Sequence, residues 1–193
     1  QDDSGQTYLL EIDPYHHMRQ AENILESGYV GDEIRNGTSI DNHMMAPNGK
    51  PVSNSFHPWV GAHLFTITGI FGNDSLMKTM FILPLIFAAL AVIPTFFITR
   101  KIAGNMGGFV AAVIIAIQPT FLSRTPAGFS DTDAYGILFP LLIIWLFIES
   151  FTTDNEKHKY IFGGLAGLAT GIFSFSWMGW WYIFDIIVGS LGI

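Results

Sequence analysis

The sequence predicts an all-α polytopic membrane protein, because apolar residues are abundant, are grouped into long runs, and follow a polar segment. Half of the 193 residues are apolar and only 13% are charged, whereas a soluble domain carries about 25% charged residues. The mean hydropathy is +0.39. The net charge of −7 argues against nucleic acid as a partner, and the absence of cysteine excludes disulfide frameworks.

The chain divides into a polar region and an apolar region. Residues 1–79 carry ten of the sixteen acidic and four of the nine basic residues, so we expect a first external loop with short helices. Over residues 80–193 we expect five transmembrane segments, because roughly 20 apolar residues cross a bilayer core about 30 Å thick. They are predicted at about 80–99, 103–121, 134–151, 160–176 and 177–193. The chain begins without an initiator Met and ends inside an apolar run, so we expect it to be truncated at both ends of a longer protein.

Basic residues in short loops predict the orientation, because such residues are enriched on the cytoplasmic side. The first two segments are linked through Arg100 and Lys101, and the third and fourth through Lys157 and Lys159. We therefore expect these links in the cytoplasm. Residues 1–79 and the link 123–133 are separated by two crossings, so both are expected on the extracytoplasmic face of the cell membrane.

Acidic residues in these two segments are candidate metal ligands. Asp13 precedes Pro14 at the start of a predicted helix that Gly28 can end, and the ordinary role of such an aspartate is an N-cap. Asp131 and Asp133 stand one residue apart in a short loop next to an apolar run. Carboxylates at this spacing can bind one hard cation such as Mg²⁺ or Mn²⁺. They could equally form a solvated turn that caps the following helix.

Three motifs together resemble the catalytic subunits of oligosaccharyltransferases. Residues 123–133 read Ser-Arg-Thr-Pro-Ala-Gly-Phe-Ser-Asp-Thr-Asp and resemble the second acidic motif of that family. Residues 11–19 read Glu-Ile-Asp-Pro-Tyr-His-His-Met-Arg and resemble the first acidic motif in its archaeal form. Residues 176–184 read Ser-Trp-Met-Gly-Trp-Trp-Tyr-Ile-Phe and resemble the aromatic hairpin between the fifth and sixth spans. The order of the motifs and the number of spans between them agree with the family across essentially the whole chain.

The resemblance implies a fold and an activity. The fold is a GT-C type transmembrane helix bundle with a large first external loop. The activity is en bloc transfer of an oligosaccharide from a lipid (dolichyl) phosphate carrier to the Asn side chain of Asn-X-Ser/Thr in proteins. The implied partners are the lipid-linked donor, the acceptor sequon and membrane lipid. The family also has a later external loop with a catalytic Glu and a C-terminal domain that binds the sequon, so we expect this chain alone to be inactive.

The resemblance also assigns site residues. It implies Mn²⁺ or Mg²⁺ as cofactor, held by Asp13, Asp131 and Asp133, and a metal on the phosphate oxygens would stabilise the charge of the leaving group. Asp13, Arg124 and Asp131 are the implied catalytic residues, and Asp13 is also expected to contact the acceptor peptide. The lipid-linked glycan is expected to contact His57, Thr132, Trp180 and Trp181. His16 stands where the family commonly has Tyr, and its role is left open.

Two alternatives are weighed against this assignment. Another GT-C membrane glycosyltransferase, such as a protein O-mannosyltransferase, would share the acidic first loop but not its pairing with the 123–133 loop. A cation transporter could use Asp131, Asp133 and Asp185, but transporters bind their ions near mid-membrane and Asp131 and Asp133 lie at a loop edge. His17, on a polar helix, is interpreted as a surface residue.

Overall fold

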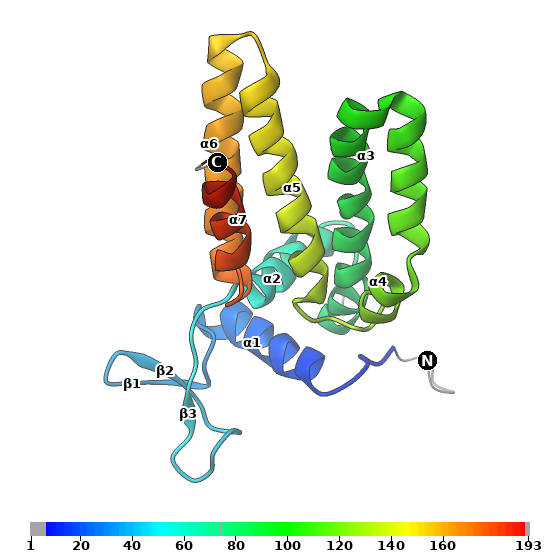
Figure 1. The fold of residues 1–193 in the computed structure, drawn as a ribbon. Helices are drawn as coiled ribbons and strands as arrows, with labels where there is room; N and C mark the ends of the chain where they lie inside the picture. The colour runs from blue at the N-terminus through cyan, green and yellow to red at the C-terminus, as the bar shows by residue number, and fades with distance from the viewer. Residues whose placement is uncertain (1–6, 74, 192–193) are drawn as a thin grey trace. The chain divides into compact units, whose positions relative to one another are not determined.

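The computed structural model describes residues 7–73 and 75–191, which fall into two compact units. The N-terminal unit comprises the chain up to Leu83 together with residues 127–131, and the helical unit comprises residues 84–126 and 132 onward. Figure 1 shows the course of the chain. The first six residues of the predicted external loop, Asp74, and the last two residues of the fifth predicted span lie outside the described residues.

Two helices form the core of the N-terminal unit. Helix α1 spans Asp13–Ser27 and helix α2 spans Phe56–Gly69. They pack through small and branched apolar side chains, which give a buried cluster of Ala21, Ile24, Val30 and Ala62. Helix α1 ends at Gly28 as predicted, because this glycine adopts a left-handed φ of 83° and donates its N–H to the Ile24 carbonyl over 3.0 Å.

The start of α1 corrects the expected role of Asp13. The N-cap is Ile12, whose carbonyl accepts bonds from the N–H groups of Tyr15 and His16, and Asp13 is the first helical residue. The exposed Asp13 carboxylate makes no hydrogen bond or ion pair with the residues that the structure describes. Its negative charge suits the positive end of the helix dipole, but it does not cap the helix.

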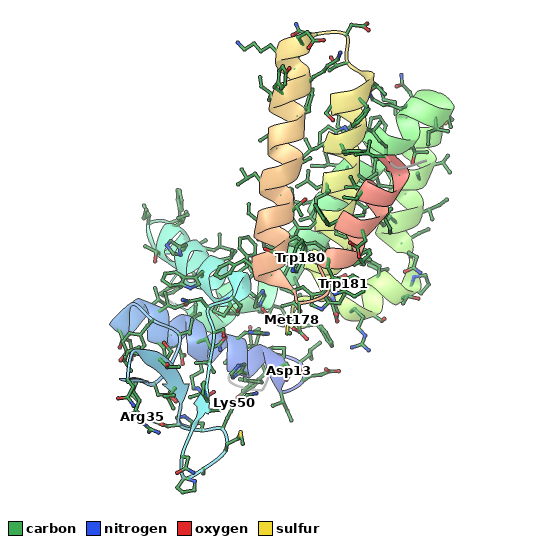
Figure 2. All side chains as sticks on the ribbon, turned by 60° about the vertical axis from the view of Figure 1, so that its left-hand side comes forward. Asp13, Arg35, Lys50, Met178, Trp180 and Trp181 are labelled. Atoms are coloured by element: carbon green, nitrogen blue, oxygen red, sulfur yellow. The ribbon has the colours of Figure 1, made fainter. Side chains whose placement is uncertain are left out.

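A small antiparallel sheet completes this unit and was not part of the all-α prediction. Strands β1 (Glu33–Arg35), β2 (Thr38–Asp41) and β3 (Lys50–Pro51) lie in the order β1-β2-β3. Arg35 and Lys50 mark its two outer strands in Figure 2. Asn36 and Gly37 form the β1–β2 turn with φ values of 52° and 80°, as a type I′ turn requires.

Residues 127–131, here named the return segment, are held in the N-terminal unit by backbone hydrogen bonds. The Gly128 N–H donates to the Phe81 carbonyl over 2.7 Å, and the Gly128 carbonyl accepts from the Leu10 N–H over 2.8 Å. Gly128 has a φ of 95°, and a Cβ atom there would lie 2.8 Å from Phe81 Cε2. Both the dihedral and the close contact therefore require glycine at this position.

The helical unit contains most of helix α3 (Leu76–Ile117). Ala103 and Gly104 leave helical geometry inside α3, so the helix consists of two arms joined by a tight turn (Figure 1). Arg100 and Lys101 lie just before this turn. Lys101 Nζ pairs with Glu149 Oε2 at 2.8 Å, which gives the Glu149 carboxylate a partner at the same end of the unit.

Four further helices follow α3. They are α4 (Pro119–Arg124), α5 (Asp133–Thr152), α6 (Glu156–Ser176) and α7 (Trp181–Leu191). Helices α5 and α6 lie side by side as an antiparallel pair (Figure 1). A buried cluster joins α3, α4 and α5 through Ala88, Ala91, Phe121 and Leu138.

Two helices, α3 and α5, are long and apolar enough to cross a membrane. Helix α7 is apolar but shorter over its described residues. The second predicted segment extends to residue 121, whereas α3 ends at Ile117 and Pro119 starts α4. The division into five membrane segments therefore stays a prediction.

Replacing Gly128 with alanine is expected to destabilise the N-terminal unit. The Gly128→Ala variant must place a side chain at positive φ against Phe81, at a cost of about 1–3 kcal/mol. Thermal unfolding of the full-length protein in detergent measures the loss. Gly69→Ala is the matched control, because a Cβ atom at Gly69 meets nothing within 4 Å. Equal unfolding temperatures for the two variants would contradict the requirement for glycine at position 128.

Candidate active site

The second acidic motif contacts helix α1 through a histidine. His17 Nε2 lies 3.4 Å from Asp131 Oδ1, and the two side chains are only 16% and 25% exposed. The interpretation of His17 as a surface residue is therefore wrong. The return segment thus contacts α1 through Asp131, and the His17 side chain is largely withdrawn from solvent.

Asp13 and His17 belong to the same face of α1. They are four residues apart, and side chains at this spacing on a helix are neighbours, with Cβ atoms about 5–6 Å apart. Figure 2 shows Asp13 at the N-terminal end of the helix. His17 in turn contacts Asp131. Asp13 and Asp131, although far apart in the sequence, thus belong to the same compact unit.

A buried histidine fixes the residue before Asp131. His57, 1% exposed, places its Nε2 atom 3.0 Å from Ser130 Oγ. Its ring meets the His17 ring edge-on, with centroids 5.0 Å apart. Burial, and to a lesser extent the neighbouring His17, lower the pKa of His57 to about 3. His57 is therefore neutral at physiological pH and serves as a hydrogen-bonding anchor for the return segment.

A second acidic cluster lies in the same unit. In the described part of the chain, one group of three acidic or histidine side chains has its ligand atoms within 4.8 Å of one another, namely Asp32, Asp41 and His43. Arg19 already neutralises this group, because its guanidinium contacts Asp41 and lies 3.8 Å from Asp32. His16 Nδ1 also lies 3.4 Å from Asp41. The cluster therefore links β2 to α1, and it is not the predicted metal-binding set.

The helical unit carries Arg124 and Asp133. Arg124 Nη1, at the end of α4, lies 3.9 Å from Asp133 Oδ2 at the start of α5, and both side chains are exposed. The two residues border a cavity of about 410 Å³ whose other walls are largely apolar, formed by Ile115, Gln118, Thr120, Phe121 and Ile137. Thr132, also in this unit, is the N-cap of α5 and is half-buried. The guanidinium of Arg124 therefore lies at the edge of a largely apolar cavity.

The predicted aromatic residues lie at the turn between α6 and α7 (Figure 2). Trp180 is half-buried with its ring 6.2 Å from Phe184, and Trp181 is 58% exposed. Trp177 instead packs against Phe173, with ring centroids 6.0 Å apart. Trp181 is therefore the more accessible of the two tryptophans assigned to the carrier.

The predicted site residues are distributed over both units. The N-terminal unit holds Asp13, His57 and Asp131, whereas the helical unit holds Arg124, Thr132, Asp133, Trp180 and Trp181. Sequence reasoning missed His17 and Ser130 as residues that contact the site. The spacing of four residues between Asp13 and His17 was the available signal, because it places both side chains on one helix face.

Comparison with solved structures identifies the fold. The chain matches an oligosaccharyltransferase from Archaeoglobus fulgidus solved with Zn and sulfate, and an oligosaccharyltransferase AglB from the same organism solved with an inhibitory peptide and a dolichol-phosphate. Both matches have a TM-score of 0.79 at 21% identity and cover 96% of this chain. The protein solved with Zn and sulfate was also solved tethered to an acceptor peptide containing the NVT sequon, and this structure has a TM-score of 0.75 at 20% identity over 95% of this chain. These matches cover 22–23% of the neighbour's chain. The fold is therefore one that archaeal oligosaccharyltransferases have.

Comparison with sequences identifies the family. A dolichyl-phosphooligosaccharide-protein glycotransferase from Methanococcus voltae is 34% identical over 200 residues, which cover 100% of this chain and 22% of that relative. The family model described as oligosaccharyl transferase STT3, N-terminal, matches residues 1–192. The chain belongs to this family. Family membership confirms the resemblance found in the three motifs and argues against the cation-transporter alternative.

The stability of the protein is expected to fall in acid partly because of His57. Unfolded His57 binds a proton below its ordinary pKa of 6.5, whereas folded His57 stays neutral down to about pH 3. The stability that His57 contributes is thus present above about pH 6.5 and is lost as the pH falls toward 3. Unfolding temperatures measured between about pH 7 and about pH 4 should decline less steeply for His57→Gln than for the parent.

The neighbouring histidine of α2 provides the control for this experiment. His63 is exposed and its Nδ1 atom lies 2.7 Å from the Trp59 carbonyl oxygen. His63→Gln should therefore keep the parental dependence on pH. An equally steep decline in the parent and in His57→Gln would show that burial of His57 does not govern the acid response.

Proposed function

We propose that the full-length protein transfers an oligosaccharide from a dolichyl phosphate carrier to the Asn side chain of Asn-X-Ser/Thr in proteins. The match of the STT3 N-terminal family to residues 1–192, which include both acidic motifs, carries this proposal. The Methanococcus voltae relative, a dolichyl-phosphooligosaccharide-protein glycotransferase, supports it, as do the dolichol-phosphate and the tethered sequon peptide in structures from Archaeoglobus fulgidus. The chain covers 22% of that relative, so the activity belongs to the longer protein.

The proposed cofactor is Mn²⁺ or Mg²⁺, held by Asp13, Asp131 and Asp133. An all-carboxylate donor set suits a hard divalent cation, and the free carboxylate of Asp13 is consistent with a ligand rather than a cap. The presence of Asp13 and Asp131 in the same compact unit also supports shared binding, as does the Zn in one neighbour structure. When bound, the metal would stabilise the negative charge that develops on the leaving phosphate.

The remaining proposed roles belong to this chain's own side chains. The Asp13 carboxylate would also accept a hydrogen bond from the acceptor amide, and the Arg124 guanidinium would donate to the phosphate of the carrier. The apolar cavity beside Arg124 supports the binding of an anion attached to a lipid. We also propose that Thr132, Trp180 and Trp181 contact the lipid-linked glycan. His57, which is buried, would act on the carrier site through its contact with Ser130.

The proposed setting is a GT-C helix bundle in the cell membrane, with five spans in this chain and the active site on the extracytoplasmic face. The two long apolar helices support membrane insertion. Arg100 and Lys101 beside the turn of α3, and Lys157 and Lys159 at the start of α6, support cytoplasmic positions for those two turns.

Removing the charge of Asp13 is expected to abolish most activity without unfolding the protein. The Asp13→Asn variant should lower turnover at least about 100-fold, roughly 2.7 kcal/mol of transition-state stabilisation, because an amide is a poor ligand for a hard cation. The measurement is the initial rate of glycan transfer to a sequon peptide at varied Mn²⁺, with thermal unfolding as a folding control. Glu26→Gln, an exposed carboxylate near the other end of α1, should keep the parental rate. Full activity of the parent in excess EDTA would remove the metal from the proposal.

The proposed orientation can be measured with reporters. A cysteine placed in the turn of α3 next to Lys101 should react only with a membrane-permeant maleimide in intact cells. A cysteine at Asn48, in the exposed loop between β2 and β3, should react with an impermeant maleimide. Because these labels differ only in access to the two faces, the opposite pattern would reverse the proposed orientation.

A further inference from the structure

We propose that His17 is the positioning residue for Asp131, so that helix α1 sets the geometry of both acidic motifs. The inference rests on the proposed function, in which Asp131 holds the divalent cation. It adds a residue that does not touch the metal or the substrate. His17 acts instead by holding the Asp131 carboxylate at a fixed place against α1.

The contact is specific to one of two adjacent histidines. His17 Nε2 lies 3.4 Å from Asp131 Oδ1, whereas His16 Nδ1 lies 3.4 Å from Asp41 Oδ2. The His16 Nε2 atom lies 3.1 Å from Gln20 Nε2. The two histidine rings therefore contact different carboxylates, His17 that of Asp131 and His16 that of Asp41. His17 therefore links α1 to Asp131 of the second acidic motif.

The surroundings of the His17 ring orient its nitrogen atoms. The ring packs edge-on against His57, with centroids 5.0 Å apart, and its side chain is only 16% exposed. The buried Nδ1 atom has no hydrogen-bond partner among the described residues. A buried N–H group without an acceptor is costly, so Nε2, which lies 3.4 Å from Asp131 Oδ1, is the nitrogen atom placed to donate to the carboxylate.

An N–H group directed at a ligating carboxylate fixes its orientation and leaves other lone pairs for a metal. Such outer contacts typically change metal affinity or activity about 10- to 100-fold when they are removed. The return segment is already fixed at Gly128 and Ser130 by the contacts described above. His17 additionally contacts the carboxylate of Asp131, which the backbone contacts of the return segment do not fix.

Two substitutions distinguish the effect of the Nε2 atom of His17 from the effect of packing by its ring. His17→Phe keeps an aromatic ring against His57 and removes Nε2, and His17→Gln keeps an N–H donor at a similar reach. In the full-length protein, His17→Phe should raise the half-saturating Mn²⁺ concentration about 10- to 100-fold, with most of the rate recovered at saturating metal. His17→Gln should recover much of the affinity. Binding of Mn²⁺ is read directly from the electron paramagnetic resonance of the free ion, and glycan transfer is measured in parallel.

The controls assign each result. His16→Phe, which alters the adjacent ring facing Asp41, should keep the parental Mn²⁺ affinity. If His17→Phe binds Mn²⁺ with the parental affinity while Asp131→Asn does not, the role of His17 is refuted and the proposed metal site is not. A parental affinity and rate for Asp131→Asn would instead refute the proposed metal site, and the role of His17 with it. If His17→Phe fails to fold, His17→Gln decides, because a 10-fold or greater loss without recovery at high Mn²⁺ would contradict positioning by a donor group.

Discussion

The binding of the return segment into the N-terminal unit is the constraint on which the candidate site depends. Gly128 joins Leu10 and Phe81 through its backbone, and its missing side chain lets Phe81 approach. His57 then holds Ser130, and His17 contacts Asp131. Each step uses a partner that is itself part of the folded unit. The position of the Asp131 carboxylate therefore follows from the packing of α1 and α2, and not from the preferences of a loop.

Helix α1 contacts one aspartate that stabilises the fold and carries another that is available for chemistry. Arg19 and His16 lie against Asp41, which is almost completely buried and needs compensation for its charge. Asp13, at the start of the helix, is exposed and has no partner among the described residues. The oxygen atoms of Asp41 already contact positively charged or N–H groups of the protein, whereas the exposed carboxylate of Asp13 can still bind a cation. The two kinds of aspartate are distinguished by these contacts and not by residue type.

Local signals predicted much of the fold. The apolar runs located the long helices, and Gly28 correctly ended α1, because both effects depend on neighbouring residues alone. The β1–β2 hairpin was missed, although Asn36-Gly37 is a strong short-range turn signal. The cap of α1 shifted by one residue to Ile12, which is within the ordinary variation of helix ends. The contacts of His17 and His57 with the return segment could not be predicted in this way. They join residues far apart in the sequence, and no periodic pattern encodes such pairs.

The discontinuity of the N-terminal unit has a consequence for biosynthesis. Residues 84–126 must be translated between Leu83 and the return segment, a gap of roughly two to nine seconds at about 5–20 residues per second. Throughout that interval the Phe81 carbonyl lacks the N–H of Gly128, and His57 Nε2 lacks the hydroxyl of Ser130. The N-terminal unit consequently cannot complete its folding as it emerges from the ribosome. Its last step must wait until both arms of α3 have been made, which couples maturation of the acidic motifs to the synthesis of the helices between them.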